Sequence, residues 1–174
     1  LPAVSVAIGV DWGFATPGAA VVARELADGS WQVIEEVQKQ GMLPEWWQEK
    51  IAELWKKHHA KVIWCDPEDA ARIATLTEEG LPAKRANNDV HRGIRYISSL
   101  MQRDMILVDK SCKVLSSQLT DYHWKQYSGG ARSEDPVKEN DHLCDALRYA
   151  IYSSVRSSRR KGGSRVTYGG AKIR

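Results

Sequence analysis

The run from Val4 to Asp11 most constrains the fold, because it is apolar and β-branched and ends at a carboxylate. Such a run is typical of a buried strand in the middle of a sheet. Trp12 and Gly13 follow it, and the Thr16-Pro17-Gly18 segment has the composition of a turn. The sequence therefore predicts a central strand that presents Asp11 at its carboxyl end.

Two more strand-like runs, 18–26 and 31–37, follow, and the segment between them contains the Asp28-Gly29 pair that favours a tight hairpin. An antiparallel three-strand meander is expected. Apolar spacing then predicts helices over 43–59, 67–79, 89–103, 113–119 and 141–156, and strands over 61–66, 81–86, 105–109 and 122–127. This order predicts an α/β fold in which helices flank a mixed sheet made of the meander and parallel strands.

Length and composition favour one soluble, intracellular domain. A chain of 174 residues with 43% hydrophobic residues can supply one sizeable core. It has no apolar run long enough to cross a membrane, and its start lacks the basic and long apolar stretches of a secretory signal. The three cysteines show no CxxC spacing, which indicates reduced, packed thiols rather than disulfides or a zinc knuckle.

Charge divides the chain into an acidic body and a basic tail. Residues 158–174 contain six Lys and Arg and no acid, so the formal net charge of +3 leaves residues 1–157 at −3. The tail is rich in Gly and Ser and lacks apolar periodicity, so we expect a folded domain over 1–157 and a disordered tail. The tail is either an arm that contacts phosphates or a linker.

Carboxylates stand where a sheet can bring them together. Asp11 and Asp66 each end a predicted strand, and Asp141 and Asp145 are four residues apart, hence on one face of the closing helix. Each of them alone has a plain structural reading as a turn or capping residue. If the two strands are neighbours, their ends lie about 5 Å apart.

Converging carboxylates repel one another unless a cation lies between them. Mg²⁺ and Mn²⁺ prefer oxygen ligands, and a pair of such ions serves phosphodiester hydrolysis. The acidic set therefore predicts a divalent-metal site.

Three motifs carry a resemblance to a known family. Val-Ala-Ile-Gly-Val-Asp-Trp-Gly at 6–13 and Val-Ile-Trp-Cys-Asp-Pro at 62–67 resemble the first two motifs of ribonuclease H-like enzymes. Lys-Glu-Asn-Asp-His-Leu-Cys-Asp-Ala-Leu-Arg-Tyr-Ala at 138–150 is similar to the closing motif of phage terminase large subunits. The resemblance spans residues 4–155.

The resemblance implies a metal-dependent endonuclease that cuts concatemeric double-stranded viral DNA during genome packaging in the host cell cytoplasm. It implies Asp11 and Asp66 as ligands of two Mg²⁺ or Mn²⁺ ions, and Asp141, His142 or Asp145 as the third ligand. Partners in the whole protein would be an ATPase motor domain, the portal and the small terminase subunit, with no membrane. The chain has no GxxxxGK[ST] motif, and it begins with Leu1, which favours an excised nuclease domain.

Contacts to DNA are expected from basic residues, which also have a plain reading as solvated surface. Lys84, Arg85, His91, Arg92 and Arg95 form one group, Lys125 lies in the aromatic and basic segment 122–127, and Lys138 precedes the closing motif. Trp46 and Trp47 are expected in the core or on a helix face rather than as a platform for bases.

Three other readings remain open. The closest rival is a Holliday-junction resolvase, which has the same fold and cuts branched DNA. A DNA-docking module in which the acids only cap helices is the non-enzymatic alternative. An actin-like ATPase also opens with a strand and Asp-x-Gly, but this chain is too short for its second domain.

Overall fold

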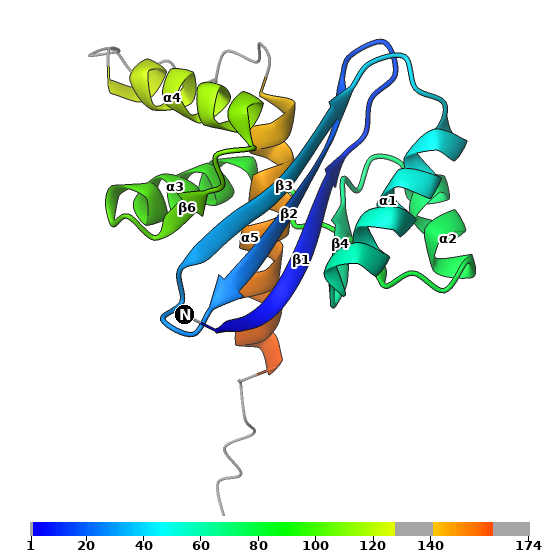
Figure 1. Cartoon of the computed structure of the whole chain (residues 1–174), viewed down its shortest axis with the longest axis horizontal. Coiled ribbons are helices and arrows are strands. Elements are labelled where there is room, and N and C mark those ends of the chain that lie inside the picture. Colours follow the sequence, from blue (N-terminus) through cyan, green and yellow to red (C-terminus); the bar gives the residue numbers. More distant parts are fainter. Residues whose placement is uncertain (1, 128–140, 162–174) are drawn as a thin grey trace, which may run out of the picture.

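A computed structural model describes residues 2–127 and 141–161. It contains a six-stranded mixed sheet in the order β5-β4-β1-β2-β3-β6, with five helices around it (Figure 1). The strands are β1 (Ala3–Asp11), β2 (Gly18–Leu26), β3 (Trp31–Lys39), β4 (Val62–Cys65), β5 (Ala83–Arg85) and β6 (Ile106–Val108). The helices are α1 (Pro44–His58), α2 (Ala70–Glu78), α3 (Val90–Gln102), α4 (Lys113–Tyr127) and α5 (His142–Lys161).

The predicted meander is confirmed. Strand β2 pairs antiparallel with both β1 and β3, whereas β4, β5 and β6 join the sheet in parallel. The Asp28-Gly29 turn has the expected chemistry: Gly29 has a φ of 81°, and the Asp28 carboxylate accepts the backbone N–H of Ser30 at 2.9 Å.

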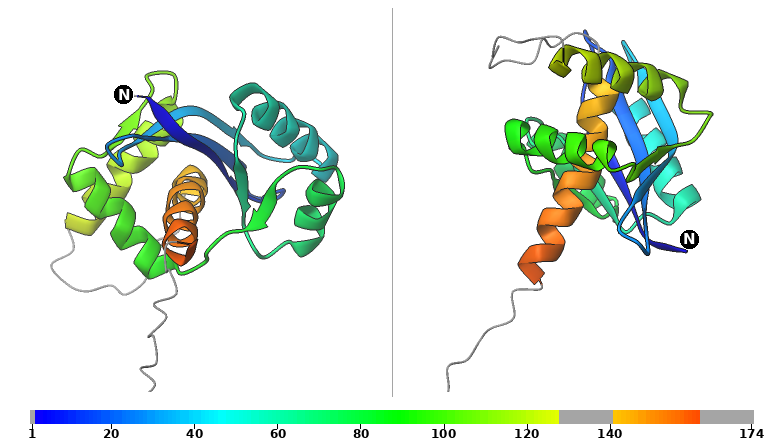
Figure 2. Two further views of the ribbon diagram at one scale, coloured as in Figure 1. Left: turned by 90° about the horizontal axis from the view of Figure 1, so that it is seen from below. Right: turned by 90° about the vertical axis from the view of Figure 1, so that its left-hand side faces the viewer.

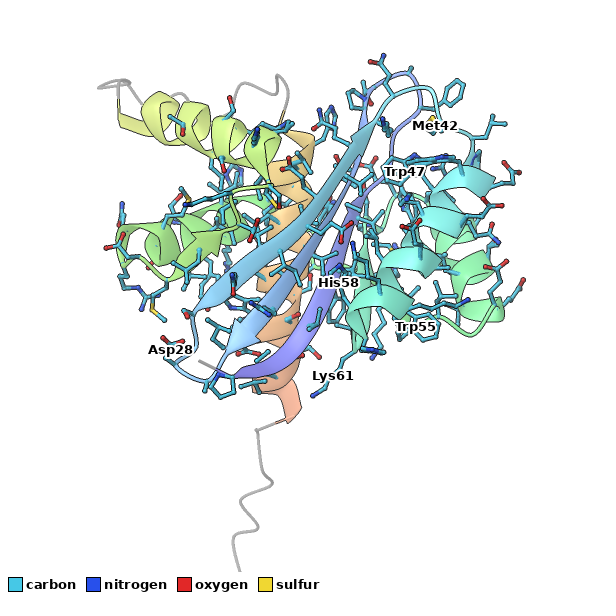
Figure 3. All side chains as sticks on the ribbon, viewed as in Figure 1. Asp28, Met42, Trp47, Trp55, His58 and Lys61 are labelled. Atoms are coloured by element: carbon cyan, nitrogen blue, oxygen red, sulfur yellow. The ribbon has the colours of Figure 1, made fainter. Side chains whose placement is uncertain are left out.

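Helices cover both faces of the sheet, with α1 and α2 on one side and α3, α4 and α5 on the other (Figure 2). Alternate residues of each inner strand therefore enter two different cores. In β1, Ala7 packs on the α5 side, whereas Ile8 and Val10 pack on the α1 side. Trp47 projects from α1 against β2, where a side chain at Gly18 would meet its ring (Figure 3). The expected core role of Trp47 is thus confirmed.

One element was predicted wrongly. Residues 122–127 belong to helix α4 and are not extended, and α4 is longer than the predicted helix over 113–119. The aromatic and polar residues of 122–127 imitate a strand pattern, but Lys113 to Tyr127 contains no Gly or Pro to end a helix. The closing helix is also longer than predicted, since α5 continues to Lys161, and the rest of the basic tail lies outside the described residues.

Cys65, Cys112 and Cys144 are free and buried, as expected. Burial raises the pKa of the Cys65 and Cys144 thiols to about 12. No described helix has the length and apolarity needed to span a bilayer.

Helix α1 ends at a residue with an unfavourable backbone conformation. Its C-cap, His59, has a φ of 50°, and its backbone N–H bonds to the Trp55 carbonyl. Only Gly adopts this left-handed conformation without steric cost. We expect His59→Gly to raise the free energy of unfolding by about 0.5–1 kcal/mol in urea titrations. Lys56→Gly, in the last helical turn, should lower it by a similar amount, and equal effects of the two changes would contradict this account.

Candidate metal centre and the comparisons with known proteins

Asp11 and Asp66 lie side by side at the carboxyl ends of two adjacent parallel strands. Strands β1 and β4 pair with Val10 opposite Cys65, and the backbone N–H of Asp66 donates to the Val10 carbonyl at 2.9 Å. Both aspartates follow the alternation of their strands onto the α5 side of the sheet, and both are buried, at 7% and 8% exposure. The predicted adjacency of these two strand ends is confirmed.

Gly9 lets helix α5 lie directly on β1 next to this edge. A Cβ atom at Gly9 would overlap the Ala146 carbonyl oxygen and lie 2.7 Å from the Ala150 nitrogen. Because the backbones approach so closely, the first turn of α5 reaches the strand end. His142 opens that turn, and its Nδ1 is 2.9 Å from Oδ2 of Asp11.

The two acids of the closing segment have different surroundings. Asp141 immediately precedes α5, and its carbonyl accepts the backbone N–H of Asp145 at 2.9 Å. The Asp145 carboxylate forms an ion pair with Arg148, with Nη2 2.9 Å from Oδ1. The structure therefore turns His142 toward Asp11 and pairs Asp145 with a guanidinium.

Burial raises the pKa of Asp11 from 3.8 to about 7. The hydrogen bond from His142 lowers this pKa, and the negative charges of Asp145 and Asp66 raise it. The carboxylates are thus close enough to repel one another, although the strand ends hold them together.

This donor set fits a divalent cation in chemistry but not yet in convergence. Oxygen ligands from Asp11 and Asp66 suit Mg²⁺ or Mn²⁺, and an added positive charge would relieve the repulsion at Asp11. In residues 2–127 and 141–161, however, no three His, Cys, Asp or Glu side chains are grouped closely enough to hold a metal ion. Asp145 or His142 has to reorient for a third ligand to join the pair.

Several neighbours of the site were not anticipated. The Trp12 indole N–H donates to the Asp66 carbonyl at 3.2 Å, which links the two strand ends. Arg148 and Tyr149 are buried beneath Asp145, and the Tyr149 hydroxyl donates to Asn88 at 3.3 Å. In the sequence these residues look like an ordinary cation and aromatics on an amphipathic helix or in a turn, and only the packing of α3 on α5 reveals them.

The basic candidates for contact with DNA are only partly described. Lys84 and Arg85 are exposed on β5, next to β4, and Cys65 pairs with Arg85, so both lie near the edge with Asp66. Arg92 is exposed on α3 and lies 3.5 Å from Asp89. Lys125 belongs to α4, but its side chain is not described, and Lys138 lies outside the described residues.

Fold and site together define a ribonuclease H-like domain with an acidic centre at the ends of its first and fourth strands. Residues 8–154 match the family described as the terminase RNaseH-like domain. The chain belongs to this family, which confirms the resemblance seen in its motifs.

Individual relatives agree. The terminase large subunit of Escherichia phage T5 is 29% identical over 154 residues, which cover 86% of this chain and 35% of that protein. The large terminase of a thermophilic bacteriophage, solved as a whole chain, has 26% identity and a TM-score of 0.75, covering 89% of this chain and 41% of that chain. The chain therefore spans well under half the length of these two relatives.

A nuclease domain solved by itself shares the fold. The large terminase nuclease domain of bacteriophage SPP1, solved with bound Mn, has 17% identity and a TM-score of 0.62, covering 86% of both chains. At this identity the match supports the fold of the domain, and roles for particular residues rest on the geometry described above.

Proposed function

We propose that this chain is the divalent-metal-dependent nuclease domain of a terminase large subunit, which cuts concatemeric double-stranded viral DNA during genome packaging. The observation that carries the proposal is the pair of buried carboxylates, Asp11 and Asp66, on adjacent parallel strand ends under the first turn of α5. Membership of the terminase family and the Mn bound to the SPP1 nuclease domain support it.

In this proposal Asp11 and Asp66 hold Mg²⁺ or Mn²⁺, two ions in the loaded site, and a residue of the 141–145 turn completes the ligand set. The ions, when bound, would activate the attacking water and stabilise the leaving oxygen of the phosphodiester. His142 orients the Asp11 carboxylate through its 2.9 Å contact. The Trp12–Asp66 hydrogen bond fixes the relative position of the two strand ends.

Lys84, Arg85 and Arg92 are proposed to contact the phosphates that flank the cut, since they are exposed on β5 and on α3. Lys125 and Lys138 stay candidates for the same role. In the whole protein we propose an ATPase motor domain, the portal and the small terminase subunit as partners, and the host cell cytoplasm as the place of action. The large terminase of the thermophilic bacteriophage has also been solved in complex with ADP, which supports the proposed motor.

The test is cleavage of supercoiled plasmid by the purified chain with Mn²⁺, Mg²⁺ or Ca²⁺, with and without EDTA. We expect Mn²⁺ and Mg²⁺ to support cutting and Ca²⁺, which coordinates more loosely, to support little. The Asp66→Asn variant, with folding checked by circular dichroism, should fall to the level seen in EDTA, because half of the carboxylate pair is lost. Glu78→Gln, an exposed acid on α2, serves as the matched control and should cut like the wild type.

Three results would contradict the proposal. Cutting that persists in Asp66→Asn would remove that residue from the site. An intact plasmid across a range of Mn²⁺ and Mg²⁺ concentrations would favour a DNA-docking module. Strong preference for a four-way junction over plasmid and linear duplex would favour a resolvase.

A further inference from the structure

Arg148 is a buried cation whose only described ionic partner is Asp145. The residue is 3% exposed, and its Nη2 and Nε lie 2.9 and 3.3 Å from Oδ1 of Asp145. Its Nη1 is buried and has no hydrogen-bond partner among the residues that the structure describes. Burying a guanidinium with an unpartnered N–H is costly, so stability alone is a poor explanation for a charge at this position.

Packing fixes the direction of the Arg148 side chain. The guanidinium carbon lies 4.5 Å from the centre of the Tyr149 ring, and the Tyr149 hydroxyl is bonded to Asn88. On the α3 side, a Cβ atom at Gly93 would lie 2.8 Å from Cδ of Arg148, so only Gly leaves room for the Arg148 stem. The guanidinium is thus clamped between α3 and the Tyr149 ring.

This clamp determines where the Asp145 carboxylate lies. Both bonds from Arg148 end on Oδ1, so Arg148 does not engage the second oxygen, Oδ2. The side chain of Asp145 is 25% exposed, against 4% for that of Arg148, so solvent reaches the carboxylate. The negative charge of Asp145 is also close enough to Asp11 to raise the pKa of Asp11.

We propose that Arg148 is a positioning residue that holds Asp145 as the third metal ligand, beside Asp11 and Asp66, with Oδ2 left for the cation. The inference rests on the proposed function and decides between Asp145 and the two other candidates, Asp141 and His142. Residues that hydrogen-bond to a ligating carboxylate fix its orientation, and their loss typically weakens metal binding about 10- to 100-fold.

The test is calorimetric titration of the metal-free chain with Mn²⁺, using the wild type, Arg148→Lys and Arg148→Gln. Lys keeps the charge but loses the rigid fork that places two N–H groups on one oxygen, and Gln removes the charge. Arg24→Lys is the matched control, because Arg24 also directs Nε and Nη2 to one oxygen, Oε1 of Gln32, at 2.9 and 2.7 Å. Urea titration and circular dichroism verify the fold of every variant.

We expect both Arg148 variants to bind Mn²⁺ about 10- to 100-fold more weakly, and the Arg24 variant to bind like the wild type. In plasmid cleavage, the Mn²⁺ concentration for half-maximal rate should rise while the rate at saturating Mn²⁺ changes much less. A purely structural role would lower stability without moving the affinity for Mn²⁺.

Two results would overturn the inference. Wild-type affinity in Arg148→Lys would show that the fork does not position a ligand. Tighter binding in Arg148→Gln would show that Arg148 only opposes the cation by its charge. Failure of the proposed function looks different, since the wild type itself would then bind no Mn²⁺.

Discussion

Gly9→Ala is expected to lower the free energy of unfolding by about 3 kcal/mol and to abolish cleavage of DNA. The added methyl group would overlap the Ala146 carbonyl oxygen and come within 2.7 Å of the Ala150 nitrogen. Both are backbone atoms of α5 and cannot rotate away, so the helix has to move off the strand. Since the first turn of α5 carries His142 and leads to Asp145, the same movement would take both residues away from Asp11.

Urea unfolding and plasmid cleavage check this prediction together. Ala3→Val is the matched control, because it enlarges a side chain on the same strand at an exposed position and should change stability by less than about 0.5 kcal/mol. A Gly9→Ala variant that retains wild-type stability and activity would show that α5 does not depend on close contact with β1.

Asp11→Asn is expected to stabilise the metal-free domain at pH 8 by roughly 2–4 kcal/mol. Burial raises the pKa of Asp11 to about 7, so above that pH the native state carries a buried negative charge beside Asp66 and Asp145. Asn is similar in shape, neutral, and still able to bond to His142. The same variant should lose cleavage, because an amide is a poor ligand for Mg²⁺ or Mn²⁺.

The pH dependence gives the sign of this effect. A carboxyl whose pKa is higher in the native state contributes its full stability below the unfolded value of 3.8, and loses it as the pH rises to about 7. The advantage of Asp11→Asn in EDTA should therefore grow between pH 4 and pH 7 and level off above it. Thermal unfolding in EDTA at several pH values measures it, with Glu78→Gln as a control at an exposed acid. A variant less stable than the wild type at pH 8 would contradict the account.

Much of the fold could be predicted because local chemistry agrees with tertiary structure there. The Asp28-Gly29 turn, the apolar run that ends at Asp11 and the helical spacing around Trp47 each specify one element. The adjacency of β1 and β4 was harder, because strand order depends on how α1 packs across the sheet and not on either strand alone. The family motifs supplied that step.

The site was only partly predictable for a related reason. Asp11 and Asp66 end strands and can be recognised by position, but Arg148 reads as a surface cation until α3 is placed over it. The role of Gly9 also depends on a partner far along the chain, the backbone of α5 at Ala146. Distant contacts of this kind leave no periodicity in the sequence.

The central claim is that Asp11 and Asp66 together hold divalent cations. The most direct test is a crystal structure of the chain soaked in Mn²⁺, with anomalous scattering recorded at the manganese edge. We predict a peak bound by a carboxylate oxygen of Asp11 and one of Asp66, with Oδ2 of Asp145 turned toward it. Well-ordered aspartates with no anomalous peak between them at saturating Mn²⁺, or a peak held by other residues, would contradict the account.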